Sequence, residues 1–188
     1  MERSFEAVLV EQCAPTLAGM KPASLFRYQG ADRQQSREAA ARWAKELAPY
    51  GITVRILKVC PQTGACLIYL YRAGWLRSIL TEPSNRAFLA RQGYGADQDC
   101  QGLLRQLSRR LCLEREFPHE IGVFLGYPLE DVVGFIENHG RNYTCCGCWK
   151  AYGDPEAARR RFDQYRRCTA VWKERFRRGA AITQLIAA

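Results

Sequence analysis

The sequence predicts an α+β fold in which a small, mainly antiparallel sheet packs with several helices. Two β-rich runs, 53–60 and 65–71, are separated by the short turn Pro61–Gly64, which is the spacing of a hairpin. Strand-like and helix-like runs do not alternate in the regular rhythm of a parallel α/β sheet. A long amphipathic pattern from Pro155 onward predicts a C-terminal helix.

The N-terminal third supplies a helix, a strand and a second helix. Apolar residues at helical spacing predict a first helix over 4–13, which we expect Pro15 to end. A short apolar run predicts a strand over 23–28, after a loop that Gly19 and Pro22 punctuate. One apolar face, formed by Ala39, Trp43, Ala44 and Leu47, predicts a helix over 32–47.

Beyond the hairpin, the pattern is mostly helical. The helices that we expect there cover 74–80, 83–91, 97–113, 118–125 and 129–138, followed by one strand within 142–152. Asp154 is a good N-cap and Pro155 a favourable first residue for the terminal helix. Its apolar stripe predicts core packing, through Ala158, Phe162, Tyr165, Thr169, Trp172 and Phe176.

Length and composition indicate an ordinary globular protein. The chain has 188 residues, 47% hydrophobic and 25% charged, so we expect one domain over 1–188, with 155–188 as a basic helix packed on it. No window reaches the ~18 apolar residues of a membrane span. The first residues lack the layout of a signal peptide, so we expect a cytoplasmic protein without membrane contact.

The formal net charge of +9 favours anionic partners without specifying one. Phosphates, acidic proteins and anionic small molecules or cofactors all fit this charge. Between Asp154 and Arg178, nine Lys or Arg stand against four Asp or Glu, so the excess is concentrated in the terminal helix. Its basic face makes nucleic-acid or protein binding an alternative function.

Nine cysteines without an export signal predict reduced thiols rather than a disulfide framework. The segment Cys13–Pro22 contains the first candidate site. A thiolate at Cys13 is favoured by nearby Lys21 and disfavoured by the negative end of the preceding helix. Gly19 would let a ligand approach the backbone, and Thr16 and Lys21 would hold an anionic group. A buried cysteine followed by an ordinary loop is the alternative.

A second candidate site is Pro118-His119-Glu120, at the start of a predicted helix. There the helix dipole lowers the pKa of a histidine, so His119 would act as a neutral base or metal ligand. Glu120 would cap its helix or assist the chemistry. If Cys13 and His119 meet in space, they form a nucleophile–base pair.

The third candidate is Cys145-Cys146-Gly147-Cys148, which contains a single Cys-x-x-Cys spacing. A structural zinc site normally uses two such pairs, so a metal here needs distant ligands such as Cys13, His119 or His139. Half-buried strand residues are the alternative interpretation.

Residues 118–137 also fit a helix-turn-helix pattern, but the second helix carries three acids and no Lys or Arg, which argues against DNA binding.

Three stretches, Cys13–Phe26, Phe117–Val132 and Cys146–Gly153, together resemble a domain-of-unknown-function family of small cytosolic proteins from anaerobic bacteria. The resemblance covers roughly Phe5 to Leu185 and implies a single-domain cytosolic protein, with no activity, fold or ligand to carry over. It draws attention to His119, Glu120, Cys146, Trp149, Lys150 and Tyr152, besides the Cys13–Lys21 residues. The family usually has an aromatic residue at position 148, and Cys145 is individual to this chain.

These observations lead to one expected pocket built from the three loops. Cys13, His119 and Glu120 would be its chemical groups, with Cys13, Cys146 and His119 holding zinc or iron if a metal is bound. An anionic small molecule or cofactor would contact the remaining members, which are Thr16, Gly19, Lys21, Trp149, Lys150 and Tyr152. The reaction class would be thiol-based redox or group transfer.

Overall fold

A computed structural model describes residues 3–187, and the chain divides into two compact units. The first unit holds the residues up to Gly74 and those from Tyr165 on, and the second holds Trp75–Gln164. Helices predominate over two small antiparallel sheets, which confirms the α+β prediction. That the two units behave as one domain stays a prediction.

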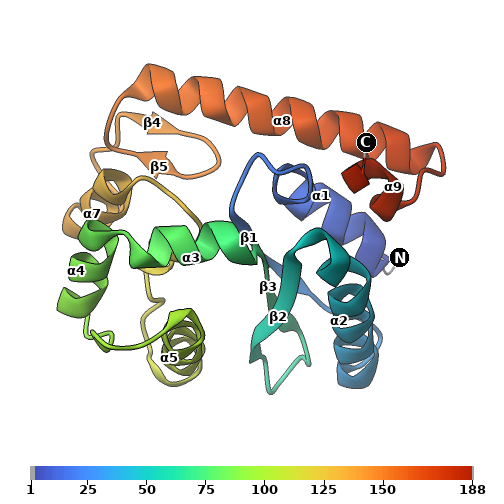
Figure 1. Cartoon of the computed structure of the whole chain (residues 1–188), viewed down its shortest axis with the longest axis horizontal. Coiled ribbons are helices and arrows are strands. Elements are labelled where there is room, and N and C mark those ends of the chain that lie inside the picture. The colour runs from blue at the N-terminus through green and yellow to red at the C-terminus, as the bar shows by residue number, and fades with distance from the viewer. Residues whose placement is uncertain (1–2, 188) are drawn as a thin grey trace. The chain divides into compact units, whose positions relative to one another are not determined.

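The first unit is built on a three-stranded antiparallel sheet, drawn in Figure 1. Its strands are β1 (Ala23–Tyr28), β2 (Ile52–Val59) and β3 (Cys66–Arg72), in the order β1-β3-β2. The predicted hairpin is confirmed, because β2 pairs with β3 through the 60–65 turn. A bulge between Ile56 and Lys58 shifts the register of β2 and leaves Leu57 buried.

Helices pack on one face of this sheet because alternate strand residues are apolar. Cys66, Ile68 and Leu70 of β3 belong to a buried cluster with residues from several helices. The helices are α1 (Phe5–Leu17), α2 (Arg33–Leu47), α9 (Ile182–Ala187) and the second part of α8 (Pro155–Arg177), and the short turn η1 (Ala48–Tyr50) follows α2. The core includes Leu9 of α1, Trp43 of α2 and Trp172 of α8.

The prediction that Pro15 ends the first helix is wrong, since α1 continues to Leu17. Proline lacks an N–H and normally disrupts a helix interior. Here the last turn is stabilised from outside the helix. Arg72 of β3 donates hydrogen bonds from Nε to the carbonyl of Thr16 (2.8 Å) and from Nη2 to that of Leu17 (2.6 Å). The bond to Leu17 gives a partner to one of the carbonyls that a helix end leaves without an intrahelical donor.

The second unit is mainly helical. Its elements are α3 (Ala73–Thr81, which begins at the end of the first unit), α4 (Pro83–Arg91), α5 (Cys100–Leu113), α6 (Ile121–Phe124), α7 (Leu129–Glu137), β4 (Cys145–Cys146), β5 (Lys150–Ala151) and the first part of α8. Leucines at helical spacing on α5 are buried, as their pattern predicts. The predicted helix over 118–125 is reduced to the single turn of α6.

The segment after α7 forms two short strands rather than the single one predicted. Cys145 pairs with Ala151 and Cys146 with Lys150, which makes a tight hairpin. Its turn packs on α8: a Cβ added to Gly147 would lie 2.2 Å from the ring of Phe162. No side chain larger than hydrogen fits at position 147 without a shift of this ring.

The amphipathic stripe predicted for the terminal helix is confirmed. Ala158 and Phe162 of α8 belong to a buried cluster of the second unit, and Trp172 belongs to the core of the first.

Within residues 3–187, no helix combines the length and the apolar character needed to cross a membrane.

Candidate functional site

Cys13 lies in the core of the first unit, fully buried on α1. Burial raises the pKa of its thiol to about 12, and the opposing effects of Lys21 and Ser24 are smaller. At neutral pH the sulfur is therefore a thiol, which is the unreactive form. The reactive role of Cys13 stays a prediction, and its surroundings do not favour it.

The other residues of the first motif have structural contacts. Gly19 has a φ of 73° and follows the C-cap of α1, where the amide of Met20 donates to the carbonyl of Pro15 and that of Gly19 to the carbonyl of Thr16. This is a Schellman motif, which needs a residue with positive φ. The buried Thr16 hydroxyl lies 2.8 Å from that of Ser24. The conformation of Thr16 and Gly19 is thus explained by their place at the C-terminal end of α1.

Asp131 of α7 connects the second and third motifs within the second unit. Its buried carboxylate accepts hydrogen bonds from Trp149 Nε1 (2.7 Å) and from the backbone amides of Tyr152 (2.6 Å) and Gly153 (3.0 Å). Trp149 also stacks on Tyr127, with ring centroids 4.7 Å apart. The roles of Trp149 and Tyr152 in ligand binding stay predictions, and their contacts with Asp131 explain the shape of this loop.

Two further members of the predicted site meet at the ring of Phe135. The centroid of the His119 imidazole lies 4.8 Å from the centroid of the Phe135 ring. Lys150 Nζ, on β5, lies 5.8 Å from the same centroid. Lys150 also donates to the carbonyl of Gly140 (2.7 Å). His119 is exposed. His119 and Lys150 thus both lie near Phe135, and that the 118–120 and 146–152 loops line one pocket stays a prediction.

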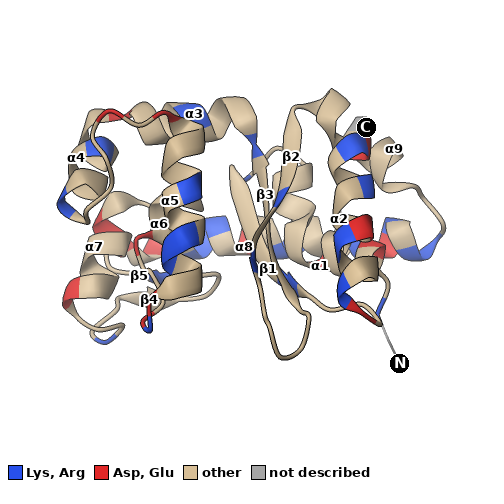
Figure 2. Cartoon of the chain, turned by 90° about the horizontal axis from the view of Figure 1, so that it is seen from below, with Lys and Arg blue, Asp and Glu red and all other residues tan. Residues whose placement is uncertain are grey.

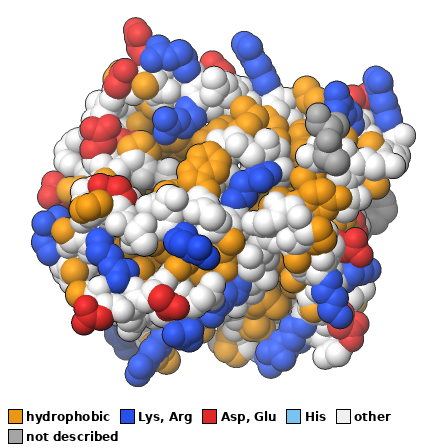
Figure 3. Space-filling view, in the orientation of Figure 1, with side chains coloured by type: hydrophobic (Ala, Val, Ile, Leu, Met, Phe, Trp, Pro, Cys, Tyr) orange, Lys and Arg blue, Asp and Glu red, His pale blue; other side chains and the backbone are white. Residues whose placement is uncertain are grey.

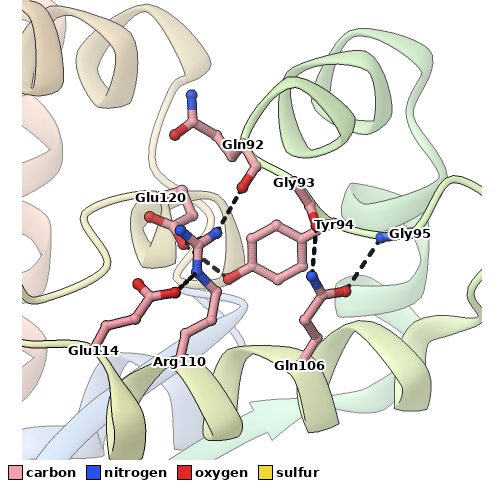
Figure 4. A network of polar contacts seen from close by, with 8 residues as sticks. All are labelled: Gln92, Gly93, Tyr94, Gly95, Gln106, Arg110, Glu114 and Glu120. Carbon is pink, nitrogen blue, oxygen red and sulfur yellow. Dashed lines mark hydrogen bonds and ion pairs between the residues drawn. The ribbon is translucent and has the colours of Figure 1, made fainter.

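Glu120 is the most deeply buried acid of the second unit, with 3% of its surface exposed. Its Oε1 accepts a hydrogen bond from the Tyr94 hydroxyl (3.0 Å) and lies 2.9 Å from Arg110 Nη1, as Figure 4 shows. Burial, and then the charge of Glu120, raises the pKa of Tyr94 well above its ordinary value. Tyr94 therefore remains a hydrogen-bond donor to the carboxylate.

Arg110 and Gln106, one turn apart on α5, fix the loop that precedes this helix. Arg110 donates from Nη1 to the carbonyl of Gln92 (2.7 Å) and from Nε to Glu114 (2.9 Å). Gln106 donates to the carbonyl of Gly93 (2.6 Å) and accepts from the amide of Gly95 (3.2 Å). Both side chains span from α5 to the loop in Figure 4. These hydrogen bonds therefore tie the loop to α5.

A groove of about 780 Å³ lies between this loop and α5, which we call the α5 groove. Its lining is polar apart from glycines and Leu113, and consists of Gln92, Gly93, Gly95, Gln98, Gly102, Arg105, Gln106, Arg109, Arg110, Leu113 and Glu114. Figure 2 marks the positions of Lys and Arg along α5 in blue. Arg105 and Arg109 are exposed, and neither has an ion pair or hydrogen bond with any residue in the described range.

Sequence reasoning missed the α5 groove. Its signal is present in the sequence as arginines at i and i+4, Arg105 and Arg109, on the polar face of a helix whose other face is leucine. The loop that forms the opposite wall has no sequence pattern that places it. Cys60, in the turn between β2 and β3, is half-exposed.

No metal centre is evident among residues 3–187, where no three His, Cys, Asp or Glu side chains gather closely enough to hold an ion. The structure therefore adds no support for zinc or iron at Cys13, Cys146 and His119. Cys13 belongs to the first unit and the other two to the second. Their pairing as nucleophile and base stays a prediction.

The comparisons with known proteins agree with the resemblance in the motifs. Neither a curated protein nor a solved structure matches the chain. A family model described as "Protein of unknown function (DUF3793)" matches residues 9–186. This match includes all three motifs and the whole α5 groove. The chain is therefore a member of the DUF3793 family.

Proposed function

We propose that this protein binds an anionic ligand in the α5 groove, with Arg105 and Arg109 as the charged contacts. The observation that carries the proposal is a pair of arginines on successive turns of α5 that have no partner among the described residues. Like charges at i and i+4 destabilise a helix by about 0.2–0.5 kcal/mol. An anion bound between them removes this repulsion and accepts charge-assisted hydrogen bonds.

The surroundings of the two arginines also favour an anion. Glu114, the acid in the lining, is paired with Arg110, which also pairs with the buried Glu120, so Glu114 does not compete for Arg105 or Arg109. The loop from Gln92 to Gly95 is fixed by Gln106 and Arg110. A preformed wall lowers the entropy that is lost when a ligand binds.

Thiol-based redox or group-transfer chemistry at Cys13 has less support. Its burial and its raised pKa both keep the sulfur protonated and inaccessible. The anionic small molecule or cofactor that we expected from the sequence remains part of the proposal, with its contacts moved from the first motif to α5.

The test is calorimetric titration of the full chain with citrate, a trianionic carboxylate, at low ionic strength. R105Q/R109Q should weaken citrate binding by at least about tenfold, since it removes two charge-assisted contacts. R159Q/R161Q removes the same charge from exposed arginines of α8 and should leave binding within about twofold. Equal weakening by both double variants would show a general charge effect and refute the groove.

A second candidate is nucleic-acid binding by the basic face of α8. Arg159 and Arg161 are exposed and make no ion pair within the described part of the chain, whereas Arg160 pairs with Glu156 at 3.7 Å. Figure 3 shows Lys and Arg side chains projecting from the edge where α8 lies in Figure 1. This candidate predicts salt-sensitive retention of an oligonucleotide that R159Q/R161Q abolishes and R105Q/R109Q preserves.

A further inference from the structure

We propose that the anionic ligand of the α5 groove is an extended acidic peptide of a partner protein, with carboxylates on alternate residues. This inference rests on the proposed function and specifies its ligand. The peptide lies along α5, and each of its two carboxylates binds one guanidinium, of Arg105 and of Arg109.

The spacing of the two arginines carries the inference. Four helical residues separate them, which is a rise of about 6 Å along the axis of α5. Side chains on the same face of an extended peptide are two residues apart, which is about 6.6 Å. Two carboxylates separated by one residue therefore face both guanidiniums at once. Adjacent carboxylates point to opposite faces of an extended chain and cannot do so.

The length and lining of the groove also fit an extended chain. From Gly102 to Leu113 the lining follows α5 for about 16 Å, which corresponds to about five extended residues. The side-chain amides of Gln92 and Gln98 form no hydrogen bond with other described residues, so they are available to the peptide backbone. Leu113, 70% exposed at the end of the groove, offers an apolar contact for one peptide side chain.

The same lining disfavours a nucleic acid as the ligand. Single-stranded nucleic acids bind proteins by stacking bases on exposed aromatic rings. No aromatic residue is among the described residues that line the groove. Tyr94, between the lining glycines Gly93 and Gly95, is 3% exposed, and the Cζ of Arg110 lies 5.2 Å from its ring centroid.

The test measures fluorescence anisotropy of labelled octapeptides with the full chain. One peptide has two glutamates separated by a glycine, the second has the same two glutamates adjacent, and the third has glutamines in place of the separated glutamates. An oligothymidine of eight nucleotides is the nucleic-acid probe. We expect the separated peptide to bind at least about fivefold more tightly than the adjacent one, and R105Q/R109Q to remove this preference.

Charge reversal provides a second, independent variant. R105E/R109E should reject the separated glutamate peptide and bind a peptide with two lysines at the same spacing, because the sign of both contacts is inverted. R159Q/R161Q is the matched control and should bind the glutamate peptides as the unmodified chain does. Since Arg105 and Arg109 are exposed, neither R105Q/R109Q nor R105E/R109E should impair folding. Circular dichroism checks this.

Three results would overturn the inference, and they separate it from the proposed function. Equal binding of the separated and adjacent peptides, with citrate binding still dependent on Arg105 and Arg109, refutes the peptide and leaves the anion site. Tighter binding of oligothymidine than of any peptide, with the same dependence, assigns the groove to nucleic acid. Citrate binding that is as tight to R105Q/R109Q as to the unmodified chain refutes the site itself.

Discussion

Arg110 Nη1 lies 2.9 Å from the buried carboxylate of Glu120, and this ion pair joins α5 to the residues before α6. The same guanidinium binds the carbonyl of Gln92 in the loop that forms the opposite wall of the α5 groove. One side chain thus compensates a buried charge and shapes the wall of the groove. Arg110 is a positioning residue, whereas Arg105 and Arg109 contact the ligand.

Removal of Arg110 should destabilise the fold more than removal of an ordinary surface arginine. Arg110→Ala leaves Glu120 buried with Tyr94 as its remaining contact, which should cost about 3 kcal/mol of unfolding free energy. Arg115→Ala, an exposed neighbour, should stay within about 0.5 kcal/mol. Urea unfolding followed by circular dichroism measures both. Equal values for the two variants would show that Glu120 does not depend on Arg110.

Loss of Asp131 should release the loop of the third motif. Asp131→Ala removes the acceptor of three hydrogen bonds, from Trp149, Tyr152 and Gly153, and should cost about 3 kcal/mol of unfolding free energy. The indole N–H signal of Trp149 in an NMR spectrum should move toward its solvent-exposed position. Glu137→Ala, at the exposed end of the same helix, is the control. An unchanged indole signal would contradict the role of Asp131.

Gly19→Ala should lower stability without affecting anion binding. The cost should be about 1 kcal/mol, because alanine is strained at a φ of 73°, and Gly19→Asn should cost less. The added Cβ meets Arg72 only at ordinary contact distance, 3.5 Å, so packing adds little. Thermal unfolding and citrate titration are the two measurements. Weaker citrate binding with full stability would restore the first motif as an anion site.

Cys60 should react faster than Cys13 with iodoacetamide at neutral pH. Hydrogen bonds from the Thr63 hydroxyl, and then from the backbone amides of Thr63 and Gln62, lower the pKa of Cys60, so more of its thiolate is present. Cys13 is buried, and its pKa of about 12 keeps it protonated. Thr63→Val should raise the pKa of Cys60 and move its alkylation profile to higher pH. Mass-spectrometric mapping in which Cys13 reacts first would support the thiol site that the sequence indicates.

Periodicity predicts most of the elements, because they follow from local contacts. The strand over 23–28 agrees with β1 at both ends, and the leucines of α5 are buried as their spacing requires. The last turn of α1, after Pro15, is bound by Arg72 of β3, which is distant in the sequence. No local pattern contains this information.

The candidate site could be predicted only in part, for the same reason. The sequence singles out Glu120 and Lys150, and the structure gives each a specific set of partners. It does not indicate that Glu120 is paired with Arg110, or that a loop faces Arg105 and Arg109, because these contacts join segments without a shared pattern. The sequence shows the charges of Arg105 and Arg109. Only the structure shows that no described acidic side chain pairs with them.

The most direct test of the anion site is an NMR titration of the full chain with citrate, in which the Nε–Hε signals of the arginine side chains are observed. A bound carboxylate hydrogen-bonds to a guanidinium and shifts the signal of that arginine. We expect the signals of Arg105 and Arg109 to shift together and to saturate, while those of Arg159 and Arg161 stay in place. Shifts confined to α8, or spread equally over the exposed arginines, would contradict the α5 groove as the binding site.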